Sequence, residues 1–192
     1  MPLLLLNMSA AFLILALYLM RGIEGEDRAK WAPAFGIAGL VALLGGLHMA
    51  WTWPLPSAYN VAFGEMSVLL GASYLGISWS VRKGWSPAVV GIYSALAGVA
   101  AALLGVRMLM LGQTAKPLFT CIGFCLSGLG AALFGSAARA GAKRGLRVLT
   151  GVMLIVAALM WALMAYYGYW LHMKGFAQWK PATQIERQVT PP

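Results

Sequence analysis

Residues 45–66 read GGLHMAWTWPLPSAYNVAFGEM, and this stretch determines the predicted fold. One long apolar run ends in it and another begins, with a short turn rich in tryptophan and proline between them. A membrane-spanning helix needs about 20 mostly apolar residues, and both runs reach that length. The stretch therefore predicts two transmembrane helices joined by a tight turn, with His48 and Glu65 placed where lipid begins.

The same apolar pattern recurs along the rest of the chain. Of 192 residues, 61% are hydrophobic and 10% are charged, which is more apolar surface than a soluble domain of this length can bury. Six segments are long enough to span a bilayer, at about 3–20, 32–52, 60–81, 87–111, 118–137 and 147–170. We predict an all-α bundle of six transmembrane helices over residues 1–171, followed by a polar C-terminal tail over 172–192.

Charge in the short connections predicts the orientation. Lys and Arg concentrate in the first, third and fifth connections, and cytoplasmic loops of membrane proteins carry such an excess. We therefore expect a multi-pass protein of the cell inner (cytoplasmic) membrane with both termini on the outer side. The net charge of +9 reflects this topology, and no nucleic-acid-binding motif accompanies it, so no nucleic-acid partner is expected.

Glycine recurs at a fixed interval through the fourth apolar segment. Every seventh residue is a glycine, at Gly84, Gly91, Gly98, Gly105 and Gly112. Small residues on one helix face let a neighbouring backbone approach closely, so this pattern predicts helix packing. A second pattern, P-x-F-x-x-x-G, opens both 33–39 and 117–123, and it is consistent with an inverted repeat of three plus three helices.

Three ionisable side chains lie at a similar predicted depth, near the outer ends of their helices. They are His48, Glu65 and Arg107. An ionisable group inside a bilayer is costly unless it is paired or hydrated, so these three are expected to face one another or water. Two interpretations stay open, a polar cluster that fixes three helices together and the outer mouth of a solute path.

A metal or haem site is the alternative for the same end of the bundle. Imidazole, thioether and thiolate together suit Cu(I), and two histidines on different helices suit haem. The side chains concerned are His48, Met66, His172, Cys121 and Cys125. Since a lone C-x-x-x-C on a helix is no metal signature, the first expectation is a protein with no cofactor. No hydrolase or nucleotide-binding motif is present, and we do not expect an enzyme.

Residues 69–81, LLGASYLGISWSV, carry a family resemblance. They resemble the amide and urea channels, small six-helix inner-membrane proteins whose third helix carries L-x-G-x-[ST]-Y-L followed closely by G-I-S. The matching positions are Leu69, Gly71, Ser73, Tyr74 and Leu75, then Gly76, Ile77 and Ser78. The resemblance implies an oligomer with one pore inside each protomer. The last predicted helix departs from the family, because it lacks a glutamate to match the acidic pore residue.

The stretch WPLPSAYNVAFGEM is also similar to an uncharacterised family of bacterial and archaeal six-helix membrane proteins. The predicted function is a channel or facilitator for a small polar or neutral solute, acting in the lipid bilayer as a homo-oligomer or as part of a membrane complex. Such a pore needs aromatic walls and a few hydrogen-bonding groups. The expected path residues are His48, Glu65, Arg107, Trp51, Trp53, Ser73, Tyr74 and Tyr93, with Trp161 as a further wall residue. A metal- or haem-binding redox subunit and a non-catalytic structural subunit are the alternatives.

Overall fold

The structure is a computed structural model, and it describes residues 1–23, 27–56 and 58–177. In this part of the chain every regular element is helical, and six helices are long and apolar enough to cross a membrane. They are α1 (Pro2–Leu17), α2 (Ala32–Thr52), α3 (Met66–Arg82), α4 (Val90–Met110), α5 (Pro117–Ala137) and α6 (Arg144–Gly175). The predicted all-α membrane bundle is confirmed. Of the predicted polar tail over 172–192, residues 178–192 lie outside the described residues.

Short helical turns extend or introduce the long helices. Two of them are π-helical: η1 (Tyr18–Gly22) continues α1, and η3 (Asn60–Glu65) leads into α3. Two are 3-10 helices: η2 (Arg28–Trp31) precedes α2, and η4 (Pro87–Val89) precedes α4. Proline stands in the first turn of α1, α2, η4 and α5, where a missing N–H costs no helical hydrogen bond.

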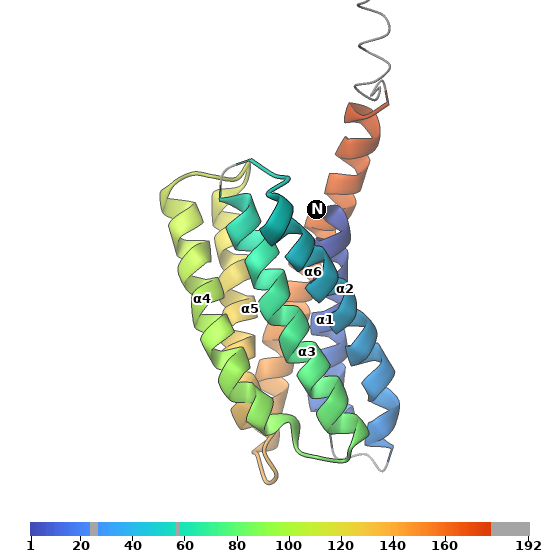
Figure 1. Ribbon diagram of the computed structural model, residues 1–192. Coiled ribbons are helices and arrows are strands. Elements are labelled where there is room, and N and C mark those ends of the chain that lie inside the picture. The colour runs from blue at the N-terminus through green and yellow to red at the C-terminus, as the bar shows by residue number, and fades with distance from the viewer. Residues whose placement is uncertain (24–26, 57, 178–192) are drawn as a thin grey trace, which may run out of the picture.

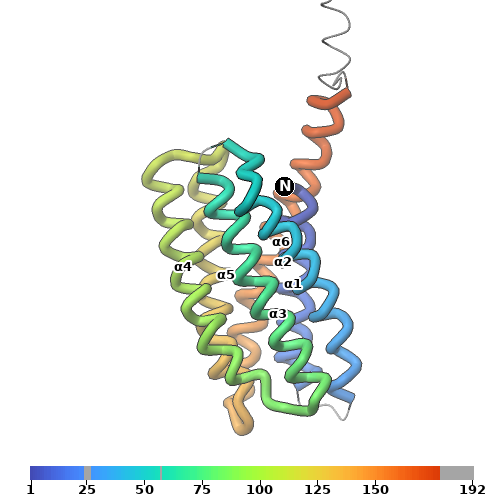
Figure 2. Tube along the Cα trace, viewed as in Figure 1, coloured from blue at the N-terminus to red at the C-terminus, as the bar shows by residue number. Residues whose placement is uncertain are grey.

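The helices run alternately up and down, so the bundle has two ends (Figure 1). The termini face carries the N-terminus, the α2–α3 and α4–α5 connections and the C-terminal end of α6. The basic face carries the other three connections. α6 is longer than predicted and continues beyond the bundle at the termini face (Figure 2).

Glycines bring α4 and α5 into close contact. A Cβ built on Gly91 would overlap the Cα of Gly135, and one built on Gly98 would overlap the carbonyl oxygen of Gly128. At Gly105 the added atom would lie 2.6 Å from the Cβ of a phenylalanine on α5. The predicted packing role is therefore confirmed for these three glycines of α4.

The packing prediction is wrong for the two outer glycines of the same pattern. Gly84 and Gly112 lie just beyond helix ends, with φ angles of +72° and +59°, and a Cβ on either would meet nothing within 4 Å. Glycine adopts this left-handed backbone at no steric cost, so both residues serve to end a helix. The seven-residue spacing of glycines thus extends beyond both ends of α4, whereas the glycines that pack against α5 lie only within α4.

Glycines also bring α2 and α3 into close backbone contact. A Cβ on Gly71 would lie 2.5 Å from the backbone nitrogen of Leu43, and one on Gly46 would lie 2.6 Å from that of Val68. The bundle thus contains two antiparallel helix pairs whose backbones nearly touch. The proposed inverted repeat stays a prediction.

Side-chain hydrogen bonds connect α1 to its neighbours. The Tyr74 hydroxyl of α3 donates to the Ala11 carbonyl at 2.8 Å, and the Ser9 hydroxyl donates to the Ala158 carbonyl of α6 at 2.8 Å. The Asn7 amide donates to a backbone carbonyl of α2 at 3.0 Å. Interhelical hydrogen bonds of this kind hold helices together where lipid supplies no hydrophobic driving force.

The turn that opened the sequence is ordered by one buried amide. The side-chain oxygen of Asn60, which is fully buried, accepts from the Leu55 N–H at 3.1 Å, and its nitrogen donates to the Leu55 carbonyl. The Tyr59 hydroxyl donates to the carbonyl of Gln113 in the α4–α5 connection. Trp53, with a left-handed φ of 49°, ends α2. These contacts tie two connections of the termini face together.

Arg147 connects α6 to the end of α5 at the basic face. Its buried guanidinium donates to the carbonyls of Ala137 and Arg139 at 3.2 and 3.3 Å, where α5 ends. Hydrogen bonds to a charged group contribute about 2 kcal/mol, so we expect Arg147→Met to lower the free energy of unfolding by about that amount. Thermal unfolding in detergent measures this, with Arg144→Met as the exposed control. Equal melting temperatures for the two variants would contradict the assignment.

Candidate functional site

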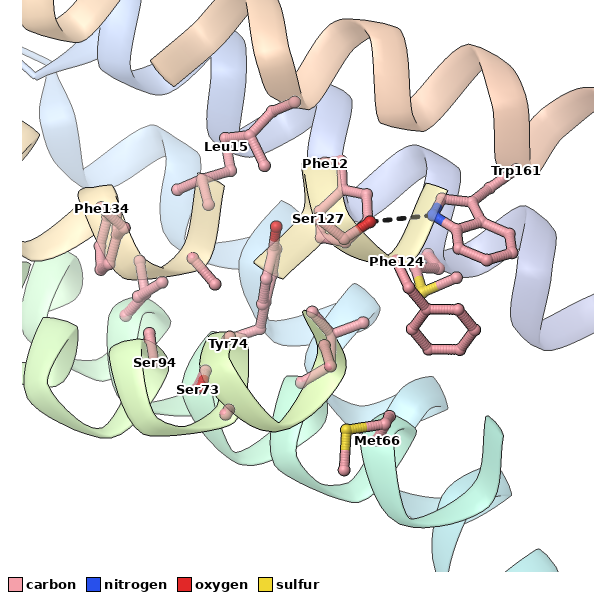
Figure 3. A pocket seen from close by; sticks show the side chains of 18 residues that line it. Phe12, Leu15, Met66, Ser73, Tyr74, Ser94, Phe124, Ser127, Phe134 and Trp161 are labelled. Atoms are coloured by element: carbon pink, nitrogen blue, oxygen red, sulfur yellow. Dashed lines mark hydrogen bonds between the residues drawn. The ribbon is translucent and has the colours of Figure 1, made fainter. Parts of the chain in front are cut away.

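A cavity of about 70 Å³ lies in the middle of the bundle (Figure 3). Residues of α1, α3, α4, α5 and α6 form its wall, and most of them are apolar. A water molecule needs about 10–15 Å³ of such space, so the cavity has room for several waters or one small solute. The polar groups in the wall are Ser73, Tyr74, Ser94, Ser127 and the indole of Trp161.

The polar groups of the wall already donate their hydrogens to the protein. The Ser127 hydroxyl donates to a backbone carbonyl of its own helix at 2.7 Å and accepts from Trp161 Nε1 at 3.0 Å (Figure 3). The hydroxyls of Ser73 and Ser94 also donate to carbonyls one turn back, at 2.9 and 3.2 Å. A hydroxyl oxygen has two acceptor lone pairs, so these two serines still offer acceptors.

No Asp, Glu, Lys, Arg or His is among the residues that line the cavity. The only titratable side chain there is the phenol of Tyr74, which donates to α1. An ion placed in such a site would lose its hydration without gaining a counter-charge. The wall therefore suits a neutral molecule.

Three aromatic rings pack at the end of the cavity nearer the termini face. Phe63, Phe124 and Trp161 form this termini-face cluster, and their ring centroids lie 5.2 to 6.2 Å apart. Phe124 and Trp161 also line the cavity, and Phe63 packs behind them from the π-helical turn η3. π-helical turns are frequent at functional sites, because they reposition side chains within an otherwise regular helix.

A second aromatic cluster lies toward the basic face. Tyr18 contacts Phe35 at 5.3 Å and Trp31 at 5.9 Å between ring centroids, and Phe35 contacts Tyr74 at 5.7 Å. Tyr18 lies on the other π-helical turn, η1. Tyr74 belongs both to this basic-face cluster and to the cavity wall. The cavity thus touches both aromatic clusters, the termini-face cluster through Phe124 and Trp161 and the basic-face cluster through Tyr74 alone, and each cluster contains one residue from a π-helical turn.

The structure places only part of the predicted solute path at this cavity. Ser73, Tyr74 and the further wall candidate Trp161 line it. Tyr93 is 43% exposed on the outside of α4, so it does not reach the centre. Trp51 and Trp53 are also exposed; Trp51 lies in the last turn of α2, and Trp53 follows the helix.

The predicted polar cluster of His48, Glu65 and Arg107 is not formed within the described part of the chain. All three side chains are exposed, and no described hydrogen bond or ion pair joins any two of them. His48 and Arg107 each follow a packed glycine by two residues, a rotation of about 200° around a helix. Since the glycine faces the partner helix, neither side chain lies in the helix contact itself, and both are exposed at the outside of the bundle.

One ion pair is present among the described residues, and it lies at the basic-face end of the second membrane span. Lys30 Nζ lies 2.9 Å from Asp27 Oδ2 at the basic face. The hydrogen bond from Lys30 lowers the pKa of Asp27. Both side chains are exposed, so this pair adds little to stability.

The residues of the metal alternative are dispersed. Cys121 and Cys125 lie on one face of α5 with their sulfur atoms 4.0 Å apart. His48 is exposed on α2, and His172 is exposed on the part of α6 beyond the bundle. Within the described ranges, no three His, Cys, Asp or Glu side chains come close enough together to hold a metal ion. The metal or haem alternative stays a prediction.

Several cavity residues were missed by the sequence reasoning. Ser94, Ser127, Phe12, Phe124 and Phe134 all line the cavity. They are scattered among other small or apolar residues of α1, α4 and α5, so no spacing marked them. Ser127 had one usable signal, because it lies within the glycine-rich face of α5 between Gly123 and Gly130.

Comparison with known protein families gives a match over most of the chain. A family model described as "Protein of unknown function (DUF981)" matches residues 1–175. Neither the curated proteins nor the solved structures contain a match to this chain. The likeness to amide and urea channels is therefore not supported by a family match, whereas an uncharacterised family is found, as the sequence around residues 53–66 suggested.

Proposed function

Because the chain belongs to the DUF981 family, described as proteins of unknown function, we propose a function from its own cavity: this membrane protein is a facilitator for a small neutral solute. The cavity of about 70 Å³ between five helices carries the proposal. It lies inside the bundle, and its mostly apolar wall carries a few hydroxyl groups that serve as polar contacts for the solute in this proposal. Its volume limits the solute to a few non-hydrogen atoms.

The two aromatic clusters act as constrictions in this proposal. Hydrophobic narrowings close channels by excluding water, and rings that move slightly open them again. The termini-face cluster, including Phe63, touches the cavity through Phe124 and Trp161, and the basic-face cluster, including Tyr18, touches it through Tyr74. In this proposal the rings close the path as they are packed here, and passage requires them to part.

The chemistry of the wall narrows the solute class. Ser73 and Ser94 offer hydroxyl oxygens as acceptors, while their hydrogens are engaged by backbone carbonyls. A neutral molecule with N–H or O–H groups, such as a small amide, urea or a short polyol, matches acceptors of this kind. Anions and cations are disfavoured, because the described wall carries no charged residue.

The wider setting follows from the charge distribution. The excess of Lys and Arg in the connections of the basic face favours a cytoplasmic basic face and outward termini in a cell inner membrane. The protein works as a homo-oligomer or within a membrane complex, without enzymatic activity and without a cofactor. A redox subunit that binds haem or copper remains the first alternative, and a non-catalytic structural subunit is the second.

Solute flux into proteoliposomes tests the proposal. Purified protein is reconstituted, and swelling is followed by light scattering with urea, acetamide and glycerol in turn. Ala101 lines the cavity, so Ala101→Leu should fill it and lower protein-dependent flux at least about threefold, a barrier change of roughly 0.7 kcal/mol. Ala100→Leu is the matched control, because Ala100 precedes it on α4 and lies outside the cavity lining.

The outcomes separate the alternatives. Flux that exceeds that of protein-free vesicles, and that falls in Ala101→Leu alone, supports the facilitator. Absence of flux for every solute, or equal flux in the two alanine variants, overturns it. A haem absorption band or stoichiometric copper in the purified protein would favour the redox subunit instead.

A further inference from the structure

A long groove runs along the lipid-facing side of α4 and α5. Its volume is about 690 Å³, and it is lined almost entirely by apolar atoms. Small residues, Gly98 and Ala102 of α4 with Gly128 and Ala132 of α5, form its floor where the two backbones come close. We call it the α4–α5 groove, and it is separate from the central cavity, with which it shares only Gly98.

The length of the groove matches one leaflet of a bilayer. It extends along α4 from Gly98, near the middle of the span, to Arg107, one turn before the helix ends. At about 1.5 Å per residue these nine steps cover roughly 14 Å. Half of a hydrocarbon core about 30 Å thick is roughly 15 Å. The groove therefore reaches from the bilayer midplane to the level of the headgroups.

Arg107 is the one charged residue that lines the groove. Its side chain is exposed, and in the part of the chain that the structure describes no carboxylate pairs with it. Lys116 directly precedes α5, but its Nζ lies over the Tyr167 ring of α6, 5.8 Å from the ring centroid. The headgroup end of an apolar groove thus presents a guanidinium without a counter-charge.

We propose that an anionic phospholipid occupies the α4–α5 groove, with its phosphate on Arg107 and an acyl chain along the floor. A guanidinium binds phosphate through paired N–H donors, which gives this end of the groove its charge complementarity. The floor of small residues supplies apolar contact at the midplane end of the groove, and Leu103 and Val106 of α4 continue the apolar lining toward Arg107. This inference is independent of the solute proposal, because the central cavity and its constrictions are not involved.

The positive charge of Arg107 argues against a second copy of the chain as the occupant of the α4–α5 groove. A two-fold dimer packs one patch against itself at one depth in the bilayer. Such a contact through the α4–α5 groove would bring two Arg107 guanidiniums together at the same level. A lipid phosphate neutralises the guanidinium, whereas a second copy of this face would repeat it.

Native mass spectrometry of the purified protein tests this. The protein is equilibrated in detergent with equal amounts of phosphatidylglycerol and phosphatidylcholine, and the lipids that remain bound are counted. Wild-type protein should retain phosphatidylglycerol over phosphatidylcholine by about fivefold, the ratio that roughly 1 kcal/mol of attraction per basic residue gives. Arg107→Gln should remove this preference. Arg144→Gln, an exposed cation outside the groove, should keep it.

A second variant tests the acyl-chain half of the site. Val99 lines the middle of the groove and is 64% exposed, so Val99→Trp narrows the groove without disturbing the core. It should lower the total amount of bound lipid at least about threefold. The proposal is overturned if Arg107→Gln keeps the preference, if Val99→Trp binds as much lipid as wild type, or if the wild type is a dimer that Val99→Trp separates.

Discussion

Gly91→Leu should prevent the bundle from closing. A single Cβ at position 91 already overlaps the Cα of Gly135, so a leucine forces α4 and α5 apart along their whole contact. Overpacking of a rigid interior costs about 1–3 kcal/mol, and here the obstacle is backbone on both sides, so we expect about 3 kcal/mol or more. Size-exclusion chromatography and thermal unfolding in detergent measure the loss of folded protein.

Gly145→Leu is the matched control for that substitution. Gly145 is also helical, but a Cβ there meets nothing within 4 Å. Since leucine favours helix over glycine by somewhat less than about 1 kcal/mol, this variant should be as stable as wild type or slightly more so. If the two variants unfolded at the same temperature, close approach of α4 and α5 would not be what holds the pair together.

Phe63→Ala should open the termini-face cluster. Phe63 is buried against Phe124 and Trp161, so removal of its ring takes away one side of the constriction. We expect solute flux into proteoliposomes to rise about tenfold, which corresponds to a barrier lowered by roughly 1.4 kcal/mol. The same change should lower the free energy of unfolding by about 3–5 kcal/mol, as is usual for a buried phenylalanine.

Two further variants keep this result interpretable. Phe63→Leu retains most of the apolar volume and should raise flux by a smaller factor while the protein stays folded. Trp79→Ala removes a large ring that is 57% exposed at the outside of α3, and flux should not change. Unchanged flux in both Phe63 variants, measured on folded protein, would show that the termini-face cluster does not limit passage.

The fold was predictable because membrane helices are marked by long apolar runs and by small residues at helix contacts. Six runs gave six helices, and the interval of seven identified Gly91, Gly98 and Gly105 as a packing face. The seven-residue spacing of the glycines did not reveal which of them pack against α5 and which lie beyond a helix end. Gly84 and Gly112 continue the pattern, yet both lie past a helix end with positive φ. The length of α6 was underestimated, because its last turns are rich in polar and aromatic residues. Such residues do not extend the apolar run from which a membrane helix is recognised.

The site was harder to predict, because rotation of each helix decides what faces the centre. Ser73 and Tyr74 were expected on the path and do line the cavity. His48, Glu65 and Arg107 were expected inside because buried charge is costly. Near a helix end, however, a long or polar side chain reaches the headgroups while its stem stays in lipid. Ser127 was missed because its role depends on contact with Trp161, a residue 34 positions further along the chain.

The length of α6 has a consequence for how its end behaves. The helix has 32 residues, about 48 Å at roughly 1.5 Å each, whereas a hydrocarbon core is about 30 Å thick. From Tyr169 to Gly175 every residue is exposed. Nucleation is the unfavourable step of helix formation, and the part of α6 in the bundle supplies that nucleus. Each residue of α6 beyond the bundle only extends a helix that is already formed. This end of α6 therefore frays residue by residue from Gly175 inward, while the bundle unfolds as one unit.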